Sequence, residues 1–260
     1  MRIALKSPLE IEAMRRAGRV VRQTLDRCRD LARPGLTTAQ LDQLAWETFT
    51  AAGAVGLFKN YPTYEEGQGF PGHTCISVND EVVHGIPGPR VLCAGDVVSI
   101  DCGVRVDGWC GDSAITVALE PAPPELRELI RVTEETLRLA IRLIRPHLRW
   151  SDVAGPMQQY VERHGFSCVR EFVGHGIGRR MHEDPKVPNF VSPEFLNRDD
   201  FYLREGMTLA VEPMVIRGRP EVAVSADGWT VVTRDHSCAA HVEHTVAVTR
   251  RGCEILTNGN

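Results

Sequence analysis

Four acidic side chains lie inside strongly apolar, strand-like stretches of this 260-residue sequence. They are Asp101, Asp112, Glu212 and Glu243. A carboxylate is costly to bury unless it is paired, hydrogen-bonded or bound to a metal ion. These four residues are therefore candidates for a site that binds metal or handles protons.

The first two of these residues can be placed by the geometry of a β-hairpin. Asp107-Gly108 is typical of a two-residue hairpin turn. With that turn, Gly103 lies opposite Asp112, and Asp101 lies on the same face, so the two aspartates are at most about 7 Å apart. Bare carboxylates at that separation repel each other, and metal ions about 3.5–4 Å apart would neutralise them. The alternatives are a solvated hairpin face or one proton shared by the pair.

Histidines add possible nitrogen donors. The apolar, glycine-rich segment Phe172–Gly178 carries His175, and His182 follows seven residues later. Glycines allow the backbone and the imidazole to approach a site closely. Each of these histidines, like His84 in the apolar segment Val82–Pro87, also fits an ordinary core position. Four carboxylates and an imidazole would together suit Mn(II), Fe(II), Co(II) or Zn(II).

The elements that position these residues follow from capping signals and hydrophobic spacing. Capping boxes at Ser7–Glu10 and Thr37–Gln40 each begin a helix. The predicted helices run from Ser7 to about Leu31, Thr37 to about Ala52, Pro123 to about Leu143, and Ser151 to about His164. Stretches rich in β-branched residues predict strands at Thr74–Val78, Val97–Asp101, Ala114–Leu119, Thr208–Val215, Thr230–Thr233 and Val242–Thr249.

Two segments resemble each other at a spacing of 112 residues. Arg33-Pro34-Gly35-Leu36 precedes a predicted helix that ends before Gly53, and Arg145-Pro146-His147-Leu148 precedes one that ends before Gly165. Four matching residues can also arise by chance. Because no linker or low-complexity stretch separates the segments, we expect one domain, residues 1–260, made of two related halves.

Composition and charge narrow the class of protein. Hydrophobic residues make up 43% and charged residues 25% of the chain, as in ordinary soluble globular proteins. The net charge of −4 comes without a basic stripe, which argues against direct nucleic-acid binding. No apolar run approaches the roughly 20 residues that span a bilayer, and the N-terminus does not look like a signal peptide. We therefore expect a cytoplasmic protein without a membrane partner, whose eight cysteines are mostly buried thiols.

Six short motifs carry a resemblance that covers essentially the whole chain. They are Ser77–Pro87, Ile100–Gly103, Gly111–Ala114, Gly174–Gly178, Val211–Pro213 and Glu243–Thr245. Together they resemble the type I methionine aminopeptidases. This resemblance implies the α+β pita-bread fold of the creatinase/aminopeptidase class, in which two pseudo-symmetric halves form a curved antiparallel sheet flanked by helices. It also implies removal of the N-terminal methionine from nascent proteins and peptides whose second residue is small and uncharged.

The resemblance further implies two divalent metal ions per chain, from among Co, Mn, Fe and Zn. Asp101 would bind one ion, His175 and Glu212 would bind the other, and Asp112 and Glu243 would bridge both. A water molecule activated by the two ions would attack the first peptide bond.

The same resemblance assigns roles around the reacting bond. Glu212 would shuttle a proton, His182 would contact the scissile bond, and His84 would position substrate or assist proton transfer to the leaving amine. The substrate-binding residues would be Phe70, Cys75, His84, His182 and Trp229. Their soft, apolar members suit a thioether side chain.

The sequence departs from the family pattern near this pocket. Gly67 stands where many relatives have a tyrosine, and Tyr61-Pro62-Thr63-Tyr64 could substitute for it. Met181 stands before His182, where relatives often have phenylalanine. These changes concern the shape of the methionine pocket and leave the implied reaction intact.

The spacing of the motifs also suggests a subtype. Only 36 residues separate His175 from Glu212, which leaves no room for the insertion of type II enzymes. The chain starts directly at the catalytic domain, so we expect the short bacterial-type form. The resemblance further implies a protein that is usually a monomer and acts on nascent chains at the ribosome.

Two other readings fit the same fold. An Xaa-Pro aminopeptidase or prolidase usually has a separate N-terminal domain and extra histidines in its active site, and the segment around Cys75 favours methionine instead. A non-catalytic binding module would typically have lost metal ligands, and all five are present in this sequence.

Overall fold

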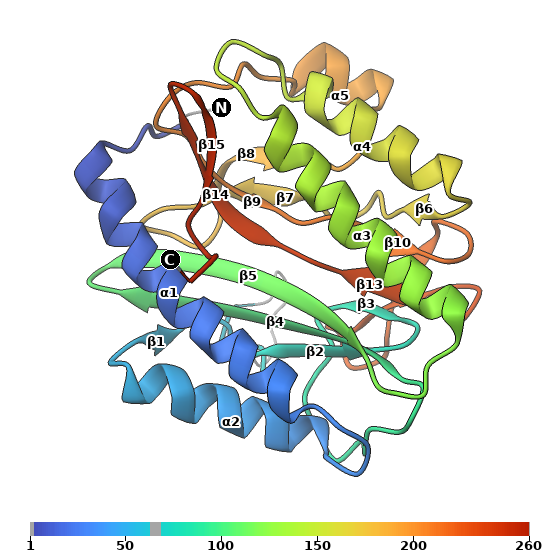
Figure 1. Ribbon diagram of the computed structural model, residues 1–260. Helices are drawn as coiled ribbons and strands as arrows, with labels where there is room; N and C mark the ends of the chain where they lie inside the picture. The colour runs from blue at the N-terminus through green and yellow to red at the C-terminus, as the bar shows by residue number, and fades with distance from the viewer. Residues whose placement is uncertain (1–2, 63–68, 260) are drawn as a thin grey trace.

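The computed structural model describes residues 3–62 and 69–259, and Figure 1 shows how their helices and strands are arranged. The helices are α1 (Pro8–Leu31), α2 (Thr38–Ala51), α3 (Pro124–Leu143), α4 (Ser151–Arg163) and α5 (Pro193–Arg198). The strands before α3 are β1 (Val55–Gly56), β2 (Cys75–Val78), β3 (Glu81–Val83), β4 (Val97–Val106) and β5 (Trp109–Ala118). The strands after α4 are β6 (Ser167–Cys168), β7 (Gly174–Gly176), β8 (Glu183–Val187), β9 (Thr208–Val211), β10 (Met214–Ile216), β11 (Val222–Val224), β12 (Val231–Thr233), β13 (Ala239–His241), β14 (His244–Thr249) and β15 (Gly252–Ile255).

Both capping boxes predicted from the sequence are present. The Ser7 hydroxyl accepts the N–H of Glu10, whose carboxylate accepts the N–H of Ser7, and Thr37 and Gln40 make the same reciprocal pair. These bonds satisfy N–H groups that the first turn of a helix leaves without partners. The four long helices lie within a residue or two of their predicted bounds, so those predictions are confirmed.

The predicted β-hairpin is also confirmed, and it is longer than the strand patterns indicated. β4 and β5 pair antiparallel along their full length, and Gly103 lies opposite Asp112. Asp107 and Gly108 form the turn with φ angles of 49° and 80°, the left-handed region that a tight hairpin turn requires. Asp101 pairs with Ala114, so it lies diagonally from Asp112 on the same face.

Two groups of helices pack against the strands. Figure 1 shows α1 lying along the β4–β5 hairpin with α2 beside it, while α3 and α4 lie toward the other side of the molecule. The apolar faces of α1 and α2 pack on β4 through a core that includes Val21, Phe49 and Ile100. A second core joins α3 and α4 to β9 and β14 through residues such as Met157 and Leu209. No helix in the described ranges is both long and apolar enough to cross a membrane.

The weak internal repeat corresponds to a repeated structure. Gly35 and His147 both have positive φ, at 91° and 74°, and both donate their N–H to a leucine carbonyl, at 2.8 and 2.9 Å. The following helices, α2 and α4, end before Gly53 and Gly165, which also share a positive φ. The matching turns and helices agree with the two related halves of the pita-bread fold.

Two strand predictions are wrong in one respect. The expected strand Thr208–Val215 is divided into β9 and β10 at Glu212-Pro213, and the expected strand Val242–Thr249 begins only at His244, after β13 has ended at His241. Proline has no N–H to donate to a neighbouring strand, so Pro213 interrupts the ladder. Each break leaves a glutamate, Glu212 or Glu243, between two strands that belong to different sheets.

Candidate metal centre

The hairpin brings Asp101 and Asp112 together in a buried place. Asp112 is only 4% exposed, and burial together with the charge of Glu212 raises its pKa to about 8. Burial, followed by the charge of Asp112, raises the pKa of Asp101 well above its usual range. Two carboxylates held this way favour a bound cation, because a cation removes both their desolvation penalty and their mutual repulsion.

Backbone pairing between the halves places Glu243 beside this pair. Glu243 donates its N–H to the carbonyl of Ala114 at 2.9 Å, and its own carbonyl accepts the Ser113 hydroxyl. Two residues further on, in β14, the Thr245 hydroxyl donates to the Asp112 carbonyl at 2.7 Å and accepts the Asp112 N–H at 3.0 Å. The second half is thereby fixed in register against β5, with Glu243 next to Asp112.

The ligand atoms form a group that fits a metal ion. One donor atom each from Asp112, His175 and Glu243 lies within 4.8 Å of the others. Asp101 Oδ1, Asp112 Oδ1 and Glu243 Oε1 are buried and have no hydrogen-bond partner among the described residues. Because native proteins almost always satisfy buried carboxylate oxygens, three such atoms at one place favour a divalent cation with oxygen and imidazole ligands.

Glu212 lies at the edge of this group, between two imidazoles. Its Oε1 is 3.7 Å from His175 Nε2, and its Oε2 is 3.5 Å from His241 Nε2. Burial acts to raise the pKa of Glu212, but the imidazoles of His241 and His175 beside its carboxylate outweigh burial and lower it. Asn189 Nδ2 donates to the Glu212 backbone carbonyl at 2.9 Å, which holds the interrupted strand in place.

The two remaining histidines of the predicted site lie near the same group. His84 is partly buried with a positive φ of 59°, and its ring meets Phe172 edge-on at 5.5 Å. Burial is the main cause that lowers the pKa of His84 to about 4. His182 is exposed, and its ring lies 4.3 Å from that of His175. Both rings therefore lie beside the acidic group, but neither belongs to the set of Asp112, His175 and Glu243 whose donor atoms lie closest together.

The predicted methionine-pocket residues also come together. Phe70 and Cys75 are buried in one cluster with Phe58 and Met181, and Trp229 packs against it with its ring 5.2 Å from that of Phe70. Cys75 lies directly opposite Asp101 in the β2–β4 pairing, so the apolar cluster adjoins the acidic group. Gly67, where the sequence lacks the expected tyrosine, lies outside the described residues.

The sequence indicated one further contribution only as a possible substitute for the missing tyrosine, Tyr61, and missed another, His241. Tyr61 packs against the Phe58 cluster, and its hydroxyl lies 2.5 Å from His182 Nδ1. His241, at the end of β13, touches Glu212 and is 2% exposed. His241 could have been found by the reasoning used for the carboxylates, since it is a polar residue in an apolar strand two positions before Glu243.

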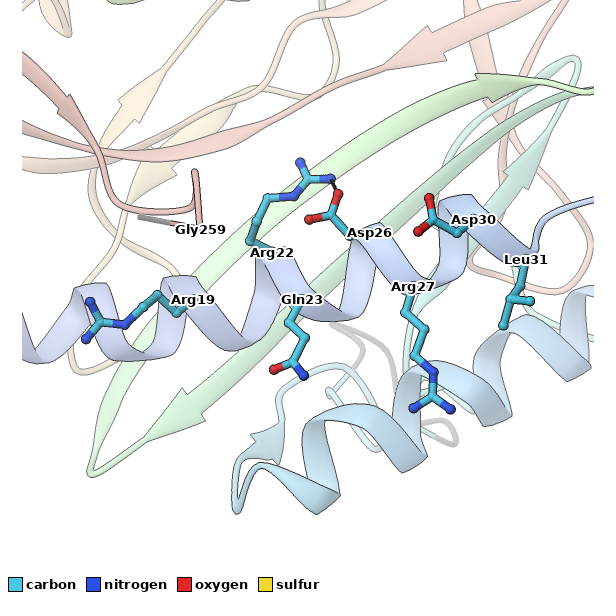
Figure 2. A pocket seen from close by; sticks show the side chains of 8 residues that line it. All are labelled: Arg19, Arg22, Gln23, Asp26, Arg27, Asp30, Leu31 and Gly259. Carbon is cyan, nitrogen blue, oxygen red and sulfur yellow. Dashed lines mark hydrogen bonds and ion pairs between the residues drawn. The ribbon is translucent and has the colours of Figure 1, made fainter.

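A separate hollow lies on the outer side of α1, away from the acidic group. Figure 2 shows its lining, and its volume is about 580 Å³. It is lined by Arg19, Arg22, Gln23, Asp26, Arg27, Asp30, Leu31 and Gly259. Arg22 is paired with Asp26, and none of the lining residues belongs to the predicted site. The hollow therefore has no part in the metal chemistry.

Comparisons with known proteins agree with the chemistry of this site. Residues 12–250 match the model of metallopeptidase family M24. The chain is 47% identical over 255 residues to the methionine aminopeptidase of Clostridium perfringens, covering 98% of each chain. It is 44% identical to methionine aminopeptidase 1 of Bacillus subtilis, covering 98% of this chain and 99% of that one.

Solved structures give the same result for the fold. The methionine aminopeptidase of Thermotoga maritima superposes with a TM-score of 0.92 at 43% identity, covering 98% of this chain and 99% of that one. The prolidase of Pyrococcus furiosus superposes with a TM-score of 0.77 at 18% identity, covering 98% of this chain and 66% of the prolidase. The latter similarity concerns the pita-bread fold alone.

Proposed function

The chain belongs to the methionine aminopeptidases of metallopeptidase family M24, and we propose that it removes the N-terminal methionine from peptides and nascent proteins whose second residue is small and uncharged. The observation that carries this proposal is the buried acidic group with three unpartnered carboxylate oxygens. The apolar cluster of Phe70, Cys75 and Trp229 adjoins this group and offers a thioether side chain a soft surface.

We propose that the group holds two divalent ions, chosen from Mn, Fe, Co and Zn. The ligands would be Asp101, Asp112, His175, Glu212 and Glu243. When bound, the ions lower the pKa of a water molecule and stabilise the charge that develops on the attacked carbonyl oxygen. The raised pKa values of Asp101 and Glu243 support this assignment, because burial without a cation disfavours their charged forms.

The chain's own side chains then handle the proton and the substrate. Glu212 lies between His175 and His241 and is ionised, so it can accept the proton of the attacking water and deliver it to the leaving amine. His182 faces His175 from the open side and would donate to the scissile peptide. His84, whose pKa is lowered to about 4, would be neutral and would position the substrate or assist proton transfer to the leaving amine.

The test is the pair of variants Asp112→Asn and Asp107→Asn. Both lie in the same hairpin, but Asp107 is an exposed turn residue whose side chain is 67% exposed. Cleavage of Met-Ala-Ser, followed by chromatography, should fall about 100-fold or more for Asp112→Asn and stay unchanged for Asp107→Asn. Full-rate cleavage by a folded Asp112→Asn protein would contradict the two-metal proposal.

A peptide panel and a metal analysis define the activity further. Met-Ala should be cleaved and Ala-Pro should not, whereas the reverse preference would indicate a prolidase-type enzyme. Protein purified without added metal should contain divalent ions, and elemental analysis measures their identity and number.

We propose further that the whole chain forms one catalytic domain that acts as a monomer in the cytoplasm, on nascent chains at the ribosome. The related proteins named methionine aminopeptidase support the N-termini of nascent chains as the substrate. Light scattering on the purified protein and co-sedimentation with translating ribosomes test the two parts separately.

A further inference from the structure

His241 has a buried ring whose Nε2 points at the candidate metal centre. The residue is 2% exposed, and its Nε2 has no hydrogen-bond partner of good geometry among the described residues. Glu212 Oε2 lies 3.5 Å from this nitrogen, at the upper limit of a hydrogen bond. A buried imidazole N–H requires an acceptor, and the Glu212 carboxylate is within reach.

The surroundings fix the position of His241. Its backbone N–H donates to the hydroxyls of Ser99 and Thr116, at 3.3 and 3.0 Å, and its carbonyl accepts the Thr116 hydroxyl at 2.6 Å. The two hydroxyls also lie 2.9 Å apart, so they form a buried polar seam between β13 and the hairpin. The ring is therefore presented to Glu212 from a backbone held by three hydrogen bonds.

Glu212 needs this kind of support because its strand is interrupted. It follows the last residue of β9 and precedes Pro213, so its position lies outside the regular sheet ladders. Asn189 holds its backbone carbonyl, but within 4 Å the carboxylate forms ion pairs only with His175, at Oε1, and His241, at Oε2, among the described residues. His175 belongs to the acidic group, so His241 contacts the carboxylate oxygen that does not face His175.

We propose that His241 is a positioning residue: its ring donates a hydrogen bond from Nε2 to Glu212 Oε2 and so fixes Glu212 Oε1 toward His175 and the metal centre. This inference deepens the proposed function, since it takes Glu212 as a ligand and proton carrier. Groups that orient metal-ligating side chains contribute about 10–100-fold to metal affinity or activity, and His241 contributes within that range.

The experiment compares His241→Leu with His241→Gln. Leucine fills a similar volume without a donor, whereas the glutamine amide nitrogen can reach the place of Nε2. Calorimetric titration of the metal-free proteins with Mn(II) should show affinity about 10–100-fold lower for His241→Leu and nearly restored for His241→Gln. With Met-Ala-Ser, kcat should follow the same order while KM changes little, and the visible absorption of the Co(II)-loaded protein should change for His241→Leu only.

Several results would overturn the proposal. Unchanged Mn(II) affinity and kcat in His241→Leu would mean that Glu212 needs no such donor, and a glutamine variant as defective as leucine would mean that ring shape matters instead. If His241→Leu does not fold, His241→Asn replaces it, because the asparagine amide is too short to reach Glu212. Weaker Mn(II) binding by His241→Leu in a protein that never cleaves Met-Ala-Ser would support the positioning role and reject the proposed function.

Discussion

Buried and half-buried carboxylates in this protein fall into two kinds. Asp42 accepts hydrogen bonds from the N–H of His73 and from both the N–H and the hydroxyl of Thr74. Asp200, whose side chain is 2% exposed, accepts from Ser151 and Arg149. These carboxylates stabilise loops, and all their partners are protein groups. The unpartnered oxygens of Asp101, Asp112 and Glu243 therefore mark the candidate metal centre as different in kind from a structural buried acid.

At the level of residues, the sequence correctly predicted which side chains lie close together where the geometry of one hairpin determines it. The Asp107-Gly108 turn sets the register of one hairpin, and this alone predicted that Asp101 and Asp112 share a face. The apolar strand around His241 could have marked it as a buried polar residue, but its contact with Glu212, 29 positions earlier in the sequence, could not be predicted in this way. Turn chemistry of a single strand pair cannot indicate a contact of that kind.

We predict that Tyr61→Phe weakens catalysis without weakening metal binding. The Tyr61 hydroxyl lies 2.5 Å from His182 Nδ1, and donation to that nitrogen leaves the proton on Nε2, where it can reach a substrate. Removing one such hydrogen bond should lower kcat/KM for Met-Ala-Ser about 10-fold while Mn(II) affinity stays the same. Tyr202→Phe, at an exposed tyrosine stacked on Arg149, is the matched control. Equal rates for the two variants would exclude this role for Tyr61.

At the level of elements, the breaks between strands position the candidate site as much as the strands do. Apolar, β-branched residues on both sides of Glu212 and Glu243 predicted continuous strands, and each is interrupted at or just before the glutamate. A continuous β9–β10 strand would keep Glu212 within a regular ladder, whereas the break at Pro213 lets the chain pass from one sheet to another. Strand propensity describes single residues and carries no information on which sheet the next residue joins.

We predict that Gly103→Ala disturbs the metal centre through the hairpin. A Cβ at Gly103 would lie 2.7 Å from the Phe58 ring and 3.1 Å from Asp112 Oδ1, so the ring must move and Asp112 must shift slightly. Overpacking of this kind costs about 1–3 kcal/mol of folding free energy, and displacement of Asp112 should also lower Mn(II) affinity. Thermal unfolding and calorimetric titration measure the two effects.

A second glycine provides the control for that substitution. At Gly88 the closest atom to an added Cβ is the Ile86 carbonyl oxygen at 4.0 Å, and Gly88 has no positive φ. Gly88→Ala should leave stability and metal affinity nearly unchanged. If Gly103→Ala bound Mn(II) as tightly as Gly88→Ala, then the space opposite Asp112 would not be needed for the centre.

For the whole molecule, the duplication explains where the candidate ligands come from. β4 begins at Val97 and β9 at Thr208, 111 positions later, and the same shift carries Asp101 onto Glu212. Each half thus places one acidic residue four positions after the start of a strand, within β4 in the first half and directly after β9 in the second. The repeat visible in the sequence has a spacing of 112, and a one-residue difference in the intervening loops hides this equivalence from a fixed-spacing comparison.

We predict that Lys6→Met destabilises the protein in a pH-dependent way. Lys6 Nζ lies 2.7 Å from Glu183 Oε2, which ties the N-terminal segment to β8, and the two side chains are 5% and 11% exposed. Burial would raise the pKa of Glu183, but the hydrogen bond and charge of Lys6 and backbone donors lower it. A lowered folded-state pKa gives stability that is present above the unfolded value and is lost as pH falls through the folded one. The loss should be about 3 kcal/mol at pH 7 and smaller at pH 4.

Urea unfolding at the two pH values measures this difference. Lys186→Met, at an exposed lysine on the same strand, should change stability little at either pH. A loss for Lys6→Met that is equal at pH 7 and pH 4 would assign the effect to packing of the lysine stem instead of its charge.

We predict that bound metal stabilises the folded protein by joining its two halves. Asp101 and Asp112 come from the first half, whereas His175, Glu212 and Glu243 come from the second, so unfolding must separate the ligands. An ion that binds only the folded state stabilises it by about 2.7 kcal/mol at 100 times its dissociation constant, which for a chain of this size raises Tm by about 5–10 °C. Calorimetry with Mn(II) and with EDTA should show this difference for the wild type and for Asp107→Asn, and Asp112→Asn should lose it. A full Mn(II)-dependent rise in Asp112→Asn would show that the stabilising ion binds elsewhere, and the acidic group could not then be what joins the halves.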